Sequence, residues 1–214
     1  MKKHQMLPMA LIGAGLGAAA GFALLSRSVK KHNTRQIDGR ARKKALERRR
    51  RSTKMLAKGI GPLGKWWGQT PIAALVTALT WRRRGRYAAL PIAGASASAA
   101  ALAWVLERAM FQRRPPPGRH SPTEPAFPSG HALQTSAVAW TAAYVLLREH
   151  AVPRSAMLPL AVLLPAASGL AKLHLDGHWL TDVLGGYLVG AAIAAPAAAG
   201  YEMARPRRRR FATH

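Results

Sequence analysis

The stretch FPSGHALQTSAVAWTAAYVLL, residues 127–147, joins a short polar motif to a long apolar run. Pro128 and Ser129 suit the start of a helix, and Gly130 lets the backbone approach a ligand closely. Free N–H groups at such a start point toward an anion, and His131 in the first turn can donate a proton to a leaving oxygen. A helix cap explains the serine and the glycine but not the histidine. The stretch therefore predicts an apolar helix with a candidate catalytic group in its first turn.

Five further apolar segments are similar to this one in length and composition. A helix needs about 20 apolar residues to cross roughly 30 Å of hydrocarbon, and charge, proline or glycine bounds each segment. None alternates with period two, and Val and Ile are sparse, so strands are not expected. An Ala-rich soluble helical protein is the alternative, but arginine clusters and tryptophans at the segment ends favour a membrane. The predicted fold class is all-α, an integral-membrane helical bundle with about six transmembrane helices, at residues 7–25, 66–81, 87–110, 131–147, 155–175 and 179–203.

Small residues are frequent in two of these segments. The last contains Gly185, Gly186 and Gly190, and the third contains an Ala/Ser run at residues 95–101. Small residues let helices approach closely in lipid, although an Ala-rich genome explains them equally well.

The charge balance is strongly basic, with 33 Lys and Arg against eight Asp and Glu and a formal net charge of +25. Such a chain needs a polyanion nearby, and anionic lipid head groups and nucleic acid are the two candidates. The absence of cysteine excludes disulfides, thiolate catalysis and Cys-ligated metals. Asp176 and Asp182 stand among apolar residues, where charge is costly and usually functional.

The basic residues divide the chain into four parts. These are a first hydrophobic segment at 1–26, a polybasic arm at 27–65, a membrane domain at 66–203 and a basic tail at 204–214. The first segment is longer than the apolar core of a signal peptide and lacks a clear cleavage site before Arg27, so we expect it to be retained.

The polybasic arm holds 15 Lys and Arg against only Asp38 and Glu47. This composition predicts binding to anionic membrane lipids. Nucleic acid is a weaker candidate because the arm has no aromatic residue before Trp66 on which bases could stack. A solvated linker remains an alternative. Counts of positive charge leave open which side of the membrane the polar clusters face.

A second polar cluster lies in the stretch AKLHLDGHWLTDVLGG, residues 171–186. His178 and Asp182 are four residues apart and would share one face of a helix. An aspartate in that position can hold one ring nitrogen protonated and leave the other for attack. His174, four residues before His178, leaves a His174/His178/Asp182 metal site as an alternative.

A third, basic cluster consists of Arg108, Arg113 and Arg114, followed by Pro115. Guanidinium groups grip phosphate with two hydrogen bonds. Arginines just beyond a helix end can equally be interfacial anchors.

Together these clusters resemble the phosphatidic acid phosphatase type 2 family, integral-membrane lipid phosphatases related to vanadium-dependent haloperoxidases. That family's pattern is Lys, six residues and Arg-Pro; then Pro-Ser-Gly-His; then Ser-Arg, five residues, His, three residues and Asp. Residues 128–131 match fully, and His178 with Asp182 matches in spacing. The resemblance covers roughly residues 66–203.

The resemblance implies a membrane phosphatase that hydrolyses a lipid phosphate or diphosphate, of the phosphatidic acid or polyprenyl diphosphate type, through a phosphohistidine. It implies that His178 attacks phosphorus, Asp182 orients it and His131 protonates the leaving group, with no metal or other cofactor. It also implies a multi-pass protein of a bacterial plasma membrane. The residues expected to bind the substrate phosphate are Arg108, Arg114, Ser129, Gly130 and Lys172.

Three departures from the family pattern affect the cations. Glu107 stands where the lysine belongs, and Ala171 with Lys172 replaces Ser-Arg. Two alternatives to a lipid phosphatase therefore stay open. One is a weakly active or non-catalytic relative that binds anionic lipid or nucleic acid through its polybasic arm, and the other is a lipid phosphotransferase.

Overall fold

The computed structural model describes residues 3–64, 66–111, 113–116 and 125–206. Predictions that concern Lys65, the loop at 117–124 and the end of the basic tail at 207–214 lie outside these residues. The described chain is helical and contains no strand, which confirms the all-α prediction.

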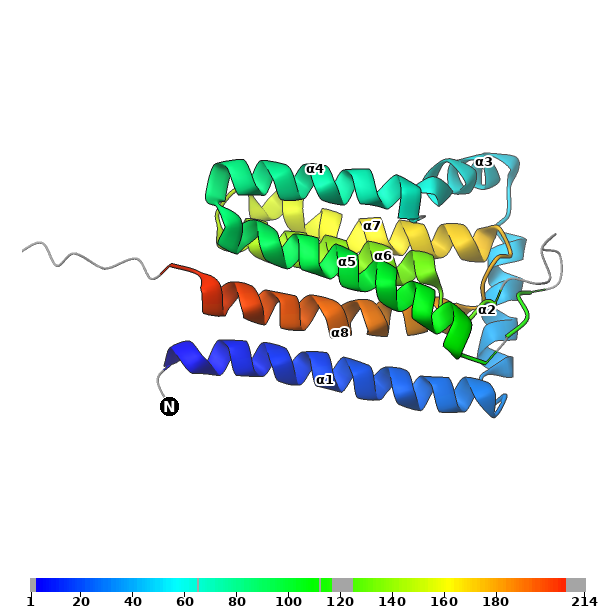
Figure 1. Ribbon diagram of the computed structural model, residues 1–214. Helices are drawn as coiled ribbons and strands as arrows, with labels where there is room; N and C mark the ends of the chain where they lie inside the picture. Colours follow the sequence, from blue (N-terminus) through cyan, green and yellow to red (C-terminus); the bar gives the residue numbers. More distant parts are fainter. Residues whose placement is uncertain (1–2, 65, 112, 117–124, 207–214) are drawn as a thin grey trace, which may run out of the picture.

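Six long helices occupy the six predicted segments and run along one axis (Figure 1). Two shorter helices, α2 (Arg35–Glu47) and α3 (Arg51–Ile60), and the 3-10 turn η1 (Gly61–Gly64) lie at one end of this bundle. Both the start of α1 and the end of α8 lie at the opposite end. The long helices are α1 (Lys3–Lys30), α4 (Trp66–Arg84), α5 (Arg86–Ala109), α6 (Gly130–Arg148), α7 (Arg154–His174) and α8 (Leu180–Ala204).

Among the described residues, the four helices α1, α5, α7 and α8 are long and apolar enough to cross a membrane by themselves. Helix α6 is less apolar because it carries polar residues such as Thr135, Ser136 and Thr141, all of which are buried. The Ser136 and Thr141 hydroxyls donate to carbonyls of their own helix, at 2.6 and 2.7 Å. These polar groups are therefore satisfied inside the bundle, as a lipid environment requires.

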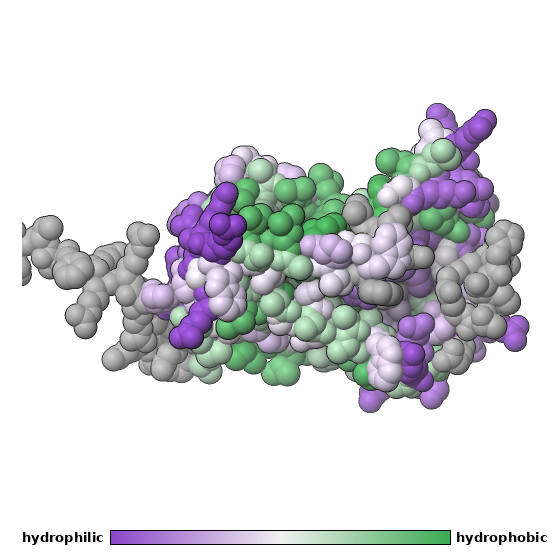
Figure 2. Space-filling view, turned by 45° about the horizontal axis from the view of Figure 1, so that its top comes forward, coloured by the Kyte–Doolittle hydropathy of each residue, from purple (hydrophilic) through white to green (hydrophobic). Residues whose placement is uncertain are grey.

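The outer surface of the bundle exposes large apolar side chains between two hydrophilic ends (Figure 2). A soluble protein rarely exposes a contiguous apolar surface of this extent. This distribution supports an integral membrane protein over the soluble alternative. The exposed apolar side chains include Leu16, Leu75, Leu90 and Val162.

Helix α8 lies at the centre of the packing and contacts α1, α5 and α6. Its glycines allow the close approach that the sequence predicted. A Cβ on Gly186 would lie 2.5 Å from the carbonyl oxygen of Ser129, and one on Gly190 would lie 3.0 Å from the Cβ of Ser136. On the α1 side, a Cβ on Gly15 would lie 2.8 Å from the Cδ of Pro196 in α8. Because Gly186 and Gly190 have no side chains, the first turns of α6 can pack directly against α8.

We predict that Gly190→Ala destabilises the protein by about 1–3 kcal/mol, because the added methyl group overpacks the contact with Ser136. Gly200→Ala is the matched control on the same helix, since a Cβ there meets nothing within 4 Å. Thermal unfolding in detergent measures both. Equal melting temperatures for the two variants would contradict close packing of α6 on α8.

Candidate active site

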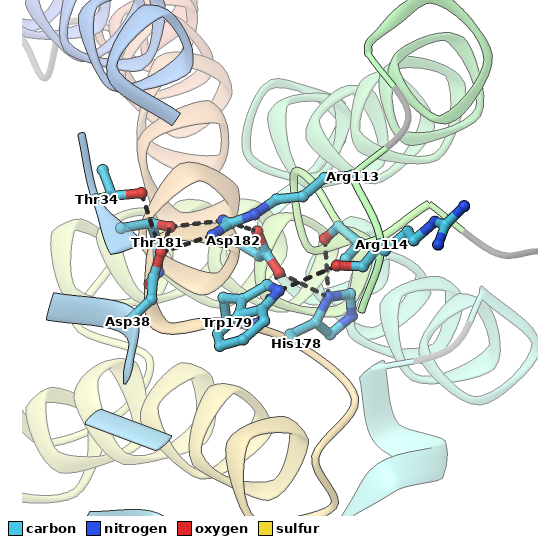
Figure 3. A network of polar contacts seen from close by, with 9 residues as sticks. Thr34, Asp38, Arg113, Arg114, His178, Trp179, Thr181 and Asp182 are labelled. Carbon is cyan, nitrogen blue, oxygen red and sulfur yellow. Dashed lines mark hydrogen bonds and ion pairs between the residues drawn. The ribbon is translucent and has the colours of Figure 1, made fainter. Parts of the chain in front are cut away.

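The candidate site lies at the end of the bundle that α2 covers. Four segments meet there: α2, the loop before α6, the first turn of α6, and the loop between α7 and α8 (Figure 3). The motif around His131 and the cluster around His178, which are 47 residues apart in the sequence, thus reach one place.

The two histidines face each other across the site. The ring of His131, in the first turn of α6, and the ring of His178 have centroids 6.5 Å apart and planes inclined by 59°. His178 is 9% exposed, so its ring is largely shielded from solvent. Gly64 of η1 packs directly on His131, because a Cβ on Gly64 would lie 2.7 Å from the His131 Cδ2 atom.

His178 does not lie on a helix, contrary to the prediction that it shares a helical face with Asp182. Helix α8 begins at Leu180, and Trp179 is its N-cap. The Asp182 Oδ2 atom accepts the backbone N–H of Trp179 at 2.7 Å, which satisfies a free donor at the N-terminus of α8, so the helix begins after Trp179. The i, i+4 spacing therefore joins His178, the residue before the N-cap, to Asp182 in the first turn of α8.

The hydrogen bond of His178 defines which ring nitrogen carries the proton. Its Nδ1 atom lies 2.8 Å from the backbone carbonyl oxygen of Ala126 and 3.8 Å from the Asp182 Oδ2 atom. A carbonyl oxygen only accepts, so Nδ1 carries hydrogen, and in the neutral ring Nε2 keeps its lone pair. The Ala126 carbonyl thus makes the contact that the sequence analysis assigned to Asp182.

Asp182 is fully buried and is held by three residues, two of them in the loop before α6. Its Oδ1 atom accepts from the Arg113 guanidinium at 2.6 Å, and Oδ2 accepts from the Trp179 N–H. Its own backbone carbonyl accepts the N–H of Ser129 at 2.9 Å. Asp182 therefore connects the loop before α6 to the first turn of α8.

Arg113 lies between Asp182 and a second buried carboxylate, that of Asp38 in α2 (Figure 3). Its Nη2 atom donates to Asp38 Oδ2 at 2.6 Å, and Nη1 also donates to the Thr181 hydroxyl at 2.8 Å. The guanidinium carbon lies 5.4 Å from the centre of the Trp179 ring. These contacts leave the guanidinium neutralised by two acids.

The residues predicted to bind phosphate occupy different environments. The Arg114 side chain is exposed and points away from the polar network, while its backbone carbonyl accepts from Trp179 Nε1 at 3.0 Å (Figure 3). Arg108 is also exposed and lies over the Trp104 ring, 4.1 Å from its centre.

Lys172, near the end of α7, lies beside Gly177, which directly precedes His178 in the sequence. Ser129 is fully buried and caps α6, its hydroxyl accepting from the N–H of Ala132 at 3.5 Å.

Sequence reasoning did not select Arg113 or Asp38 as site residues. Arg113 was grouped with Arg108 and Arg114, but the motif favoured Arg114 because it precedes Pro115. Asp38 carried one usable signal, since it is one of only two acids among 15 cations in the polybasic arm. An acid in so basic a segment indicates a specific partner.

The structure offers no support for the alternative metal site at His174, His178 and Asp182. Within residues 3–64, 66–111, 113–116 and 125–206, no three His, Asp or Glu side chains gather closely enough to hold a metal ion.

Comparison with known proteins identifies the family and the fold. The family model of the PAP2 superfamily matches residues 87–206, which is more than half of the chain. A solved structure, the transmembrane PAP2-type phosphatidylglycerolphosphate phosphatase from Bacillus subtilis, superposes with a TM-score of 0.78. The two sequences are 21% identical, and the match covers 92% of this chain and 99% of the other. No curated protein matches the sequence significantly.

We predict that Arg113→Gln lowers the free energy of unfolding by about 3–5 kcal/mol, because it leaves two buried carboxylates without a cation. Arg114→Gln, at the adjacent exposed position, should change it by less than about 0.5 kcal/mol. Thermal unfolding of the detergent-purified variants measures the difference. Similar melting temperatures would show that the Arg113 ion pairs do not stabilise the fold.

Proposed function

The chain belongs to the PAP2 superfamily, and we propose from this premise that it hydrolyses a lipid phosphate or diphosphate through a phosphohistidine on His178. The observation that supports the proposal most strongly is the pair of facing histidines, 6.5 Å apart by ring centroid, with the Nδ1 of His178 bonded to a carbonyl. This hydrogen bond directs the Nε2 lone pair of the neutral ring to act as the nucleophile.

The spacing of the rings suits a phosphoryl group between them. In a reactive geometry the nucleophile lies about 3–3.5 Å from phosphorus, and a proton donor lies about 2.6–3.2 Å from the leaving oxygen. Together these distances require rings separated by roughly 6 Å or more, which is comparable with the observed centroid separation.

In the proposed first step the Nε2 atom of His178 forms a bond to phosphorus as the bond to the lipid oxygen breaks. His131 gives its proton to that oxygen, so the lipid leaves as an alcohol, or as a monophosphate if the substrate is a diphosphate. In the second step His131 takes a proton from water, which attacks phosphorus and breaks the N–P bond. Inorganic phosphate leaves, and both histidines return to their starting states.

The phosphate oxygens need cations and N–H donors during these steps. We propose that Lys172 and the Gly130 N–H bind the phosphate oxygens, because Lys172 lies beside the loop of His178 and Gly130 is the first residue of α6, next to His131.

The other predicted residues would act less directly. Arg114 and Arg108 are exposed and would reach a phosphate by rotating their side chains, which for Arg108 means leaving the Trp104 ring. Ser129 would contribute by capping the helix, since its N–H is bonded to the Asp182 carbonyl. Asp182 would act on His178 indirectly, through the loop that it holds.

The substrate is proposed to be a lipid because the site lies at the end of an apolar bundle, where head groups gather. Phosphatidic acid and polyprenyl diphosphate are the two expected classes, and the name of the Bacillus subtilis protein adds phosphatidylglycerol phosphate. We place the protein in a bacterial plasma membrane. The exposed cations of the polybasic arm, among them Arg40, Lys44, Arg50 and Lys54, would bind its anionic lipids.

A purely non-catalytic lipid binder would use the arm as a separate module. The contacts of Asp38 with Arg113 and of Gly64 with His131 weigh against it, because the arm reaches both halves of the site. A phosphotransferase would use the same phosphohistidine with a lipid acceptor in place of water.

We predict that the purified protein releases inorganic phosphate from at least one of phosphatidic acid, polyprenyl diphosphate and phosphatidylglycerol phosphate. His178→Ala and His131→Ala should each lower kcat by about 10²–10⁴-fold. His174→Ala, at the last residue of α7, is the matched control and should keep near-normal activity. Phosphate transferred to a second lipid without release would favour the phosphotransferase, and no turnover of any substrate would contradict both enzymatic proposals.

We also predict that Lys172→Arg raises activity, because arginine holds phosphate with two parallel hydrogen bonds and lysine acts as a point charge. The gain should appear mainly as a lower KM for the lipid phosphate. Arg154→Lys, at the opposite end of α7, is the control for a generic Arg/Lys effect. An unchanged or weaker Lys172→Arg enzyme would show that the altered motif does not limit phosphate binding.

A further inference from the structure

Among the described residues outside the six long helices, Asp38 in α2 is the most deeply buried acid, at 1% exposure. Its two carboxylate oxygens accept hydrogen bonds from three residues. Thr34 donates at 3.0 Å, the Arg113 guanidinium at 2.6 Å, and Thr181 donates both its backbone N–H at 3.0 Å and its hydroxyl at 2.9 Å. A carboxylate so fully satisfied inside a protein is held in one orientation.

Two chains of hydrogen bonds connect Asp38 to the residues next to His178. The first runs through Arg113 to Asp182, whose side chain caps α8 at Trp179, the neighbour of His178. The second runs directly to the N–H of Thr181 in the first turn of α8, where a negative charge also suits the helix dipole. Asp38 therefore holds the segment that carries His178 from a helix outside the bundle.

Anchoring α2 does not by itself require Asp38. The same helix is attached a second time by Arg42, which donates from Nε and Nη2 to the two oxygens of Asp176, each at 2.8 Å. The hydrogen bond to Asp176 raises the pKa of Arg42. The two anchors differ in their targets, since only Asp38 reaches Arg113 and the first turn of α8.

We propose that Asp38 is a positioning residue for the reaction. It holds the Arg113 guanidinium against Asp182, and this contact keeps the start of α8 and the His178 loop in the geometry needed for attack. The inference rests on the proposed function, and it makes α2 of the polybasic arm a working part of the active site. Displacing a reacting group by about 1 Å can lower a rate about 10²-fold, so a remote anchor of this kind can matter for catalysis.

The test compares Asp38→Asn with Arg148→Gln, at a temperature well below both melting points. Asparagine has the same shape and keeps the acceptor for the Thr181 N–H, but it removes the charge that pairs with Arg113. We expect Asp38→Asn to lower kcat at least 10-fold with KM changed less than about threefold. Arg148→Gln removes the ion pair with Glu202 at the opposite end of the bundle and should leave kcat within about threefold, even if it lowers the melting temperature as much.

A double variant tests whether Asp38 acts through Arg113. If it does, adding Asp38→Asn to Arg113→Gln costs little further activity, because the route is already broken. Losses that multiply, or an Asp38→Asn enzyme as active as the parent protein, would overturn the inference and leave the proposed phosphatase intact. A parent protein without activity on any lipid phosphate would overturn both.

Discussion

The Arg113 guanidinium lies between the carboxylates of Asp38 and Asp182, with a 2.6 Å contact to each. Removing one cation and two anions from water costs several kcal/mol per ion, and only close geometry with further hydrogen bonds compensates for it. Here Thr34, Thr181 and the Trp179 N–H supply those bonds. Because the three charges come from α2, the loop before α6 and the first turn of α8, the network joins segments that the apolar bundle alone leaves unconnected.

The network can form because the helices beneath it approach closely. Gly186 brings α8 against the carbonyl of Ser129, and at this distance the Ser129 N–H bonds to the Asp182 carbonyl. The first turns of α6 and α8 are therefore joined by backbone contacts, which do not depend on rotatable side chains. His131 is placed by one of these turns and His178 by the loop before the other, so the separation of the two rings follows from helix packing. In a lipid environment, where helix association relies on van der Waals contact, glycine is well suited to this role.

The sequence predicted the parts of the protein that depend on local composition. The length of each apolar run predicted the six helices, and the Pro-Ser-Gly-His motif predicted the cap of α6 and the position of His131. Spacing alone was less informative for His178, because residues four apart can share a helical face or flank a cap, and only the Trp179 to Asp182 hydrogen bond distinguishes the two. The contact from Arg113 to Asp38 spans 75 residues. No periodicity in the sequence records such a pair, and the scarcity of acids in the polybasic arm was the one sign that Asp38 has a specific partner.

The same network clarifies the altered cations of the family pattern. Arg113 lies beside the ring of Trp179, the neighbour of His178, but its charge is balanced by Asp38 and Asp182, so it adds little positive field for a phosphate. Glu107 is exposed at the end of α5, and Ala171 adds no charge. Of the cations in the matched motifs, Lys172 is the one that lies beside the His178 loop, which is why we propose it as a phosphate-binding residue. On the proposed mechanism, such a site would depend on rigid placement of its histidines more than on strong electrostatic binding, which gives a physical reason for anchoring the His178 loop from a helix outside the bundle.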